Sequence, residues 1–432
     1  MFFYSTNNKS LRVSLKEAVL KGLADDGGLF MPERIPQLPP SFFENIHKHS
    51  VDEICFSVAD TLIGDDLVKE NLHWIVSESI NFPIPLVKVT DNIFSLELFH
   101  GPTLAFKDVG ARFMARLLSY FREGENSDIT VLVATSGDTG SAVANGFLEV
   151  KGIKVVILYP SGKVSEIQEK QLTTLGQNIT ALEVKGTFDD CQALVKRAFS
   201  DKELNKKTTL TSANSINVAR LIPQSFYYFI AYSQLQKSKL PVIFCVPSGN
   251  FGNLTAGLIA KRMGLPVEKF IAATNVNDVV PEYLASGKFS PRSSRQTISN
   301  AMDVGNPSNF ARMLDLYQHD LKLMQQDIAG HHFTDEETRR TMKEVYRQHD
   351  YLLDPHGAVG FTAIQKYLAH HQATGIFIET AHPAKFIDVV EEVIGEKIEM
   401  PARLAVCVSK PKQSVVMENS YGDLQDFLLQ QD

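Results

Sequence analysis

The 432-residue sequence is poor in the features that mark secreted and membrane proteins. Its four cysteines (Cys55, Cys191, Cys245 and Cys407) lie far apart and form no C-x-x-C pair, which favours reduced thiols over a disulfide framework. No apolar run approaches the roughly 18 residues that a membrane span needs. The first twenty residues lack a continuous apolar segment and a small-residue cleavage site. We therefore expect a cytoplasmic protein without membrane contact.

Strong positive charge and metal-ligand spacing are missing as well. The net charge is −7 and there is no strongly basic tract, so nucleic acid is not an expected partner. The twelve histidines form neither an H-E-x-x-H nor an H-x-x-x-H pattern, and we expect no structural metal. Hydrophobic residues make up 44% of the chain and charged residues 22%, as in ordinary globular proteins. The length suggests two or three domains.

From about residue 94 onward, short β-branched runs alternate with helical patterns. The runs predicted to be strands are 94–99, 129–134, 153–158, 242–246, 271–275, 375–379 and 404–408. The main helical patterns between them are 141–149, 164–175, 189–199, 216–235 and 253–263. This alternation predicts an α/β fold with largely parallel sheets. In such sheets ligands bind beyond the carboxyl ends of the strands, so the turns after the strands matter most.

The sequence divides into three expected parts. Residues 1–93 form a leading region, whose helical patterns are interrupted by glycine- and proline-rich segments. Residues 94–240 and 241–432 form two α/β domains, and we allow their strands to interleave. The polar stretch 286–300 is expected to be a long mobile loop.

Lys107 follows a predicted strand and turn, and it stands at the start of an amphipathic helix. Val109, Phe113, Leu117 and Phe121 recur every four residues after it. A lysine ammonium at a helix start faces the positive end of the helix dipole, so the neutral amine or an imine is favoured there. A Schiff-base lysine requires this. An ordinary surface lysine is the alternative, because helix starts tolerate one.

A glycine-containing turn, PSGNFGN at 247–253, follows the predicted strand 242–246. Gly249 and Gly252 allow the backbone to approach a phosphate, and the following helix start supplies N–H donors. The turn is neither a Walker A motif nor G-x-G-x-x-G, and it lacks a lysine, which indicates a phosphate that is held and not transferred. A plain strand-to-helix turn is the alternative. A lysine and a phosphate loop together suit pyridoxal phosphate, which carries an aldehyde and a phosphate.

Two further turns carry candidate polar groups. After the strand 129–134, hydroxyls and amides at a helix start suit an anion such as a carboxylate, or they only cap the helix. After the strand 375–379, Thr380 offers a hydroxyl to the crevice, although threonine at a helix N-cap is common.

Four segments together resemble the threonine synthase family, pyridoxal-phosphate enzymes with the fold type of the tryptophan synthase β subunit. They are ELFHGPTLAFKD at 97–108, ATSGDTGSA at 134–142, VPSGNFGN at 246–253 and ETAHPAKF at 379–386. The resemblance extends to about residue 400, and the long leading region resembles the bacterial and fungal subgroup. It implies two open, largely parallel α/β domains with the cofactor in the cleft between them (fold type II), plus an N-terminal extension domain.

The resemblance also implies roles for individual residues. Lys107 would form the internal aldimine with pyridoxal phosphate. The cofactor phosphate would be held by Gly249, Asn250, Phe251, Gly252 and Asn253. Thr380 would hydrogen-bond the pyridine nitrogen. The amino-acid end of the substrate would be surrounded by Thr135, Ser136, Asp138 and Thr139. Lys163 and Arg220 are candidates for the substrate phosphate, although each is also compatible with an ordinary surface charge.

The implied reaction converts O-phospho-L-homoserine and water into L-threonine and phosphate, with Lys107 as the base, in a monomer or a homodimer. A serine/threonine dehydratase is an alternative, because it shares the lysine and the glycine loop but needs no groups for a second phosphate. A catalytically silent homologue that binds phosphorylated ligands is another. A nucleotide-binding Rossmann protein is disfavoured, since no acidic residue ends the second strand of a G-x-G-x-x-G unit.

Overall fold

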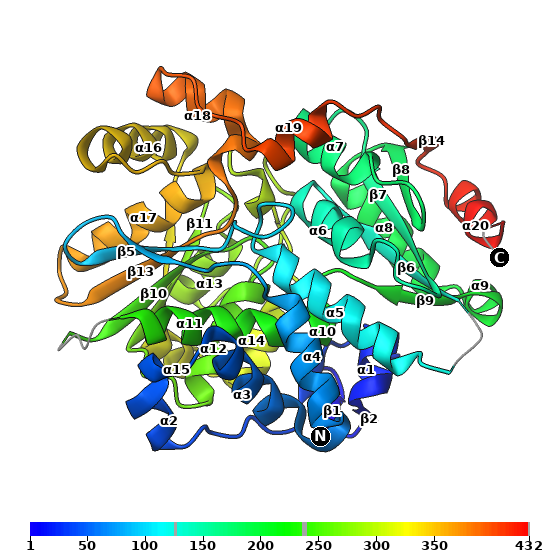
Figure 1. Cartoon of the computed structure of the whole chain (residues 1–432), viewed down its shortest axis with the longest axis horizontal. Coiled ribbons are helices and arrows are strands. Elements are labelled where there is room, and N and C mark those ends of the chain that lie inside the picture. The colour runs from blue at the N-terminus through cyan, green and yellow to red at the C-terminus, as the bar shows by residue number, and fades with distance from the viewer. Residues whose placement is uncertain (125–127, 236–239, 431–432) are drawn as a thin grey trace.

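A computed structural model describes residues 1–124, 128–235 and 240–430. The described strands form a five-stranded, a six-stranded and a small three-stranded sheet. In Figure 1 the five-stranded sheet lies to the upper right, the six-stranded sheet lies to the left, and the N-terminal region lies below them. The α/β class predicted from the sequence is confirmed.

The five-stranded sheet has the order β14-β8-β7-β6-β9, and its strand pairs are parallel. Its central strand β7 is buried along almost its whole length, as expected for a parallel sheet covered on both faces. The strands are β6 (Ile129–Ala134), β7 (Ile153–Pro160), β8 (Ile179–Lys185), β9 (Thr209–Ser212) and β14 (Val415–Glu418). The associated helices are α5 (Lys107–Phe121), α6 (Asp138–Phe147), α7 (Glu166–Thr173), α8 (Phe188–Ser200) and α9 (Lys202–Lys207).

The six-stranded sheet has the order β12-β11-β10-β13-β5-β4, in which only the edge strand β4 is antiparallel to its neighbour. Its strands are β4 (Leu86–Lys88), β5 (Ile93–Glu97), β10 (Val242–Pro247), β11 (Lys269–Thr274), β12 (Ile328–His332) and β13 (Thr374–Glu379). Strand β5 precedes the five-stranded sheet in the sequence yet pairs with β13, which follows most of it. The chain therefore crosses from the six-stranded sheet to the five-stranded sheet through the segment that carries Lys107.

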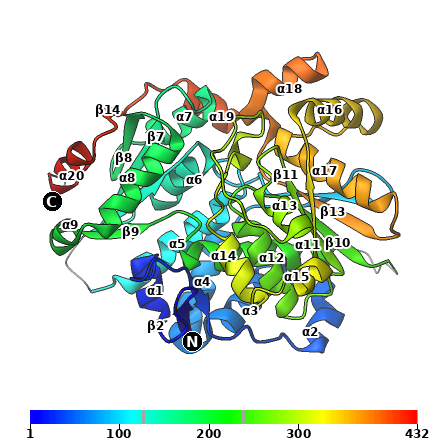
Figure 2. The same ribbon diagram turned by 180° about the vertical axis from the view of Figure 1, so that it is seen from behind.

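Further helices cover the six-stranded sheet and link the two sheets, several of them visible from behind (Figure 2). They are α10 (Val218–Leu221), α11 (Phe226–Gln234), α12 (Gly252–Arg262), α13 (Val279–Ser286), α14 (Phe310–Leu316), α15 (Leu321–Asp327), α16 (Asp335–His349), α17 (Pro355–Leu368), α18 (Ile387–Ile394), α19 (Ala402–Val408) and α20 (Tyr421–Leu429). Short 3-10 helices are η3 (Ile222–Ser225), η4 (Asn300–Met302) and η5 (Pro383–Phe386).

The N-terminal region builds a three-stranded antiparallel sheet and a layer of helices that packs against α5 and α11. Its strands are β1 (Phe2–Ser5), β2 (Arg12–Ser14) and β3 (Phe30–Pro32), and its helices are α1 (Leu15–Lys21), α2 (Pro40–Asn45), η1 (Ile46–Lys48), α3 (Val51–Ile63), η2 (Gly64–Asp66) and α4 (Lys69–Ser79). Helix α3 starts with a capping box between Ser50 and Glu53, which satisfies two N–H groups at the helix start.

Most strands expected from the sequence form close to their predicted bounds, but the strand predicted at 404–408 is wrong. That segment is the helix α19, which begins after Pro401 and buries only Leu404. A short apolar run does not by itself distinguish a strand from a helix. Here the run packs against α7 instead of joining a sheet.

The polar segment between α13 and η4 contains no helix or strand, in line with its prediction as a loop. It is nevertheless fastened to α13 and to the turn after β11. Asn277 exchanges hydrogen bonds with the backbone of Arg295, and Arg292 pairs with Glu282 at 2.6 Å. Asp303, beyond η4, accepts hydrogen bonds from Asn277 and Thr297, among others.

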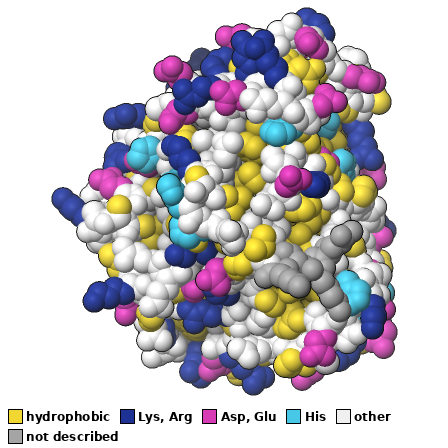
Figure 3. Space-filling view, turned by 90° about the vertical axis from the view of Figure 1, so that its left-hand side faces the viewer, with side chains coloured by type: hydrophobic (Ala, Val, Ile, Leu, Met, Phe, Trp, Pro, Cys, Tyr) yellow, Lys and Arg dark blue, Asp and Glu magenta, His cyan; other side chains and the backbone are white. Residues whose placement is uncertain are grey.

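The face at the left of Figure 1, where β5, β10 and β13 lie, carries hydrophobic side chains in its middle and charged side chains mainly around them (Figure 3). In the described ranges, no helix is both long and apolar enough to cross a membrane.

Candidate active site

A cavity opens where the carboxyl ends of strands from both large sheets meet. Lys107 at the start of α5, the turn after β6, the glycine turn after β10 and Thr380 after β13 all contribute to its wall. The predicted site residues that line it are Lys107, Thr135, Ser136, Thr139, Arg220, Gly249, Asn250, Phe251, Gly252, Asn253 and Thr380. The structure thus brings together turns that are distant in the sequence, as expected for parallel sheets.

Lys107 is the first residue of α5. The residues that lead into it, Ala105 and Phe106, are held by the segment around Thr380. The Phe106 N–H donates to the Thr380 carbonyl at 2.9 Å, and Ala105 forms a β-bridge with Ala381. Burial lowers the pKa of the Lys107 amine to about 8, against an opposing contribution from the Asp138 carboxylate. Lys107 and Thr380 are therefore positioned by one set of backbone contacts.

The glycine turn leads directly into α12 through Phe251, whose φ of 58° is left-handed. At Gly249 a Cβ atom would lie only 2.6 Å from the Ala301 carbonyl oxygen, so a side chain does not fit without a shift of backbone. Asn250 turns its side chain to the Ser215 hydroxyl (2.6 Å) and the Ser308 N–H (2.6 Å). The turn offers an anion its backbone at a helix N-terminus.

Two buried nitrogen atoms in the cavity wall lack a partner among the described residues. They are Nδ2 of Asn253, whose Oδ1 accepts a hydrogen bond from Tyr228, and Nε of Arg220. Buried donors are normally satisfied, so both point to an anionic ligand. With the low-pKa amine of Lys107 close by, the donor set fits pyridoxal phosphate and a second anion.

The turn after β6 is held by its own hydrogen bonds. Oγ1 of Thr135 accepts from the N–H groups of Gly137 (2.9 Å) and Gly140 (2.8 Å). Gly137 has a φ of +141° and its missing Cβ would lie 2.6 Å from the side chain of Gln168. Thr135, Ser136 and Thr139 all line the cavity, but the Thr135 hydroxyl is engaged within the turn and shapes it.

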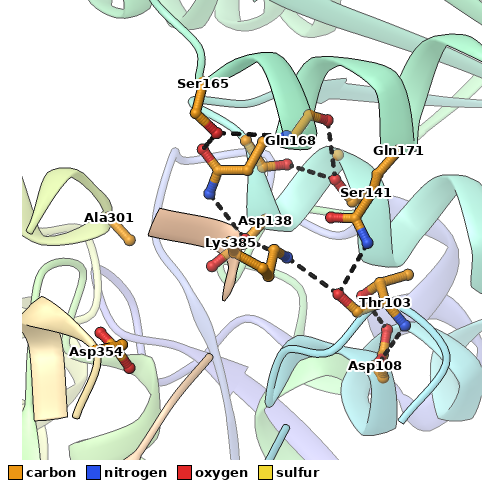
Figure 4. Close-up of polar contacts among 12 residues, drawn as sticks. Thr103, Asp108, Asp138, Ser141, Ser165, Gln168, Gln171, Ala301, Asp354 and Lys385 are labelled. Atoms are coloured by element: carbon orange, nitrogen blue, oxygen red, sulfur yellow. Dashed lines mark hydrogen bonds and ion pairs between the residues drawn. The ribbon is translucent and has the colours of Figure 1, made fainter. Parts of the chain in front are cut away.

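Asp138 and Lys163 are not among the cavity-lining residues. Asp138 is buried beside the cavity, with Oδ1 at 2.6 Å from Nζ of Lys385 and 2.9 Å from Nε2 of Gln168 (Figure 4). Lys385 holds the pKa of that carboxyl well below its usual range, although burial opposes this. Lys163 is exposed in the turn after β7.

Arg220 in α10 is buried at the cavity wall. Its Nη1 donates to the Ala213 carbonyl at 2.6 Å, which fixes the guanidinium, and burial lowers its pKa to about 10. Asn214 and Ser215 line the wall next to it. The sequence analysis missed these two neighbours because β9, the strand that positions their turn, was not predicted.

His356 was also missed. At the start of α17 it lines the cavity, with Nδ1 at 2.6 Å from Oδ1 of Asp354. The Ala301 N–H donates to Nε2 of His356 at 3.2 Å, so Nδ1 carries the proton. Ala301 in turn packs on Gly249, so His356 supports the glycine turn through Ala301. The signal in the sequence was an Asp-Pro-His triplet at a helix start.

The fold and the site together define a pyridoxal-phosphate-dependent enzyme of fold type II. The family model of pyridoxal-phosphate dependent enzymes matches residues 82–376, and those for the threonine synthase N terminus and C-terminal region match 2–80 and 357–428. The chain belongs to the threonine synthase family.

Individual relatives agree over the whole length. The chain is 45% identical to a threonine synthase of Haemophilus influenzae, over 99% of this chain and 100% of that protein. The crystal structure of threonine synthase from Escherichia coli superposes with a TM-score of 0.94 at 42% identity, covering 100% of both chains. The pyridoxal-phosphate-bound threonine synthase from Brucella melitensis gives 0.93 at 35% identity, covering 100% of this chain and 99% of that one.

Proposed function

We propose that the protein converts O-phospho-L-homoserine and water into L-threonine and phosphate, with pyridoxal phosphate as cofactor. The observation that carries this is one cavity with a low-pKa lysine and two separate sets of anion donors, the glycine turn and the Arg220 wall. A dehydratase needs only the first set. The family relationship supports the same reaction.

In this proposal Lys107 binds the cofactor aldehyde, and the turn Gly249–Asn253 holds its phosphate through backbone N–H groups and the free Nδ2 of Asn253. The Thr380 hydroxyl meets the pyridine nitrogen. Because a hydroxyl is neutral, it leaves that nitrogen largely unprotonated. When bound, pyridoxal phosphate supplies the electron sink that stabilises negative charge on the substrate's α-carbon.

Lys107 is the proton carrier. With pyridoxal phosphate and substrate bound, Nζ would remove the proton from the substrate's α-carbon and would serve the later proton transfer at the β-carbon. Burial has already lowered the pKa of this amine to about 8, close to that of a working base. Phosphate then leaves the γ-carbon and water adds at the β-carbon.

Arg220 holds the departing phosphate. Its Nε is buried without a partner among the described residues, and Nη1 is anchored on Ala213. The Ser215 hydroxyl accepts from Asn250 and Asn309, so its own hydrogen is free to point elsewhere. We propose that Arg220 binds the substrate phosphate in place of Lys163, because Lys163 is exposed and does not line the cavity wall. We propose Ser136 and Thr139 as the residues that bind the carboxylate end of the substrate.

We further propose that the enzyme acts in the cytoplasm as a monomer or homodimer. Its free thiols suit a reducing compartment. We divide the chain functionally into 1–93, 94–240 and 241–432. Strand β5 belongs to the second part but pairs with β13 in the sheet of the last part.

The Arg220→Met variant tests the second anion site. KM for O-phospho-L-homoserine should rise roughly 10-fold to 100-fold, because a charge-assisted pair with phosphate is lost. Retention of pyridoxal phosphate, measured by its visible absorbance, should stay the same. An unchanged KM, or loss of cofactor and substrate binding together, would remove Arg220 from the substrate site. Comparison with L-threonine as substrate identifies any dehydratase activity.

A further inference from the structure

Lys385 is a buried lysine beside the cavity for which the proposed reaction has no use. It lies in η5, five residues after Thr380, and its side chain is fully buried at 0% exposure. Nζ is 2.6 Å from Oδ1 of Asp138 and donates to the Thr103 carbonyl at 3.1 Å (Figure 4). Burying an ammonium is costly unless it is paired, so this position is specifically compensated.

The three segments that Lys385 joins all surround Lys107. Thr103 lies in the turn after β5 that leads into Lys107, Asp138 lies after β6, and Lys385 lies after β13. They come from both large sheets. The Lys385 amine therefore connects the segment that leads into Lys107 with the turn after β6.

Helix α7 completes the same network from outside. Gln168 donates to Oδ1 of Asp138 at 2.9 Å, and Gln171 donates to the Thr103 carbonyl at 3.0 Å (Figure 4). The Thr103 N–H donates to Oδ2 of Asp108 at 2.8 Å, directly next to Lys107 in the chain. The Asp138 carboxylate and the Thr103 carbonyl are thus each held by a second partner as well, which fixes the position of the Lys385 ammonium.

The charges around Lys107 show what this placement achieves. The Asp138 carboxylate favours the ammonium form of Lys107, whereas Lys385 and Arg220 oppose it. With Lys385 in place, the charge of Asp138 is already compensated at 2.6 Å. Without Lys385, the buried carboxylate would have Lys107 as its nearby cation, since Gln168 is neutral.

We propose that Lys385 is a positioning residue, whose ammonium occupies the Asp138 carboxylate and so keeps Lys107 out of an ion pair and available to the cavity. The inference rests on the proposed role of Lys107 as the cofactor lysine and base. Besides Lys107, Asp138 and Lys385 themselves, one further charged group, Arg220, acts on the pKa of Lys107. The charge of Lys385 also acts on the pKa values of Asp108, His382 and Cys407.

The test measures protonation of Lys107 in the full-length chain after removal of pyridoxal phosphate. Competitive labelling with acetic anhydride across a pH series, read by mass spectrometry, gives the pKa of that lysine without any need for turnover. For Lys385→Met we expect the pKa to rise by about one unit or more, because Asp138 becomes unpaired. For Asp138→Asn we expect it to fall, and for the double variant we expect it to return toward the wild-type value.

Lys397→Met is the matched control, because that side chain is 90% exposed, and it should leave the pKa of Lys107 unchanged. A purely structural role for Lys385 would lower the stability of both single variants without shifts of opposite sign. An unchanged Lys107 pKa in Lys385→Met would overturn the proposal. If that variant does not fold, an unchanged pKa in Asp138→Asn overturns it equally.

In the holoenzyme, the rise of kcat with pH should move to higher pH in Lys385→Met, with little change in KM for O-phospho-L-homoserine. A change confined to KM would contradict the proposal. The labelling experiment stays informative if the enzyme releases no phosphate, because it does not depend on the reaction. Failure of the inferred role of Lys385 and failure of the proposed function are therefore distinguishable.

Discussion

The amine of Lys107 combines a place at a helix start with removal from water. The sequence suggests the helix dipole as the reason for a neutral lysine. The structure adds removal from water as the largest effect on its pKa, and the nearby cations Lys385 and Arg220 act in the same direction. The position of Lys107 was thus predictable from the sequence, whereas its electrostatic surroundings were not.

The lowered pKa of Lys107 predicts how kcat depends on pH. The pKa of Lys107 is lowered from its ordinary 10.5 to about 8, and only the neutral amine accepts a proton. With saturating O-phospho-L-homoserine, kcat should rise with pH through about 8 and then level off. Steady-state rates between about pH 6 and pH 10 provide the measurement. A kcat that is already constant from the acidic end would exclude an amine of this pKa as the base.

Arg312 in α14 is a buried cation whose guanidinium binds mainly backbone carbonyls, with one further hydrogen bond to Oδ1 of Asn309 at 2.7 Å. Its guanidinium donates to the carbonyls of Phe30 (3.0 Å), Ser215 (3.1 Å) and Ile216 (2.6 Å). It therefore ties the N-terminal sheet to the turn that carries the cavity residue Ser215. This gives the N-terminal region a contact with the site that its sequence did not reveal.

Arg312→Met should lower the free energy of unfolding by about 2–5 kcal/mol, because several buried carbonyls lose their donor. Denaturant unfolding measures the loss. The control is Arg340→Met on the exposed side of α16, which should stay within about 0.5 kcal/mol of the parent. Equal midpoints for the two variants would show that the contacts of Arg312 contribute nothing to stability.

At the scale of elements, the sequence predicts what local pattern controls. Strand β6 forms over the predicted residues 129–134, because its run is buried throughout and bounded by turn residues. Strand β14 was not predicted, since Val415 and Val416 are largely exposed and the strand exists only by pairing with β8. The helix α19 shows the opposite error, where a tertiary contact with α7 overrides strand propensity.

The glycine turn after β10 gives a prediction for one element. In Gly249→Ala the new Cβ would meet backbone atoms of Ala301 and Met302 at 2.6 and 2.8 Å, so the turn or η4 must shift. We expect affinity for pyridoxal phosphate to fall on the order of 10-fold to 100-fold. Absorbance titration of the cofactor-free protein gives the value.

Gly422→Ala is the control for this change, because its Cβ would lie 3.8 Å from the nearest atom, Oγ of Ser420. Unaltered cofactor affinity in Gly249→Ala would mean that the phosphate does not lie at this turn.

For the whole molecule, function depends on how the chain divides between two sheets. Lys107 follows β5, and Thr380 and Lys385 follow β13 of the same six-stranded sheet, whereas Asp138 follows β6 of the five-stranded sheet. The motifs identify each turn separately, because each has its own local pattern. Contacts between turns, such as that of Lys385 with Asp138, depend on strand order and could not be read from the sequence.

The measurement that tests the central claim most directly is phosphate release from O-phospho-L-homoserine by the purified protein, with the amino-acid product identified by chromatography. We expect phosphate and L-threonine in equal amounts, and loss of both in Lys107→Ala together with the visible absorbance near 400 nm that a lysine-bound cofactor gives. A protein that binds pyridoxal phosphate but releases no phosphate, or a Lys107→Ala variant with near-normal turnover, would contradict the account.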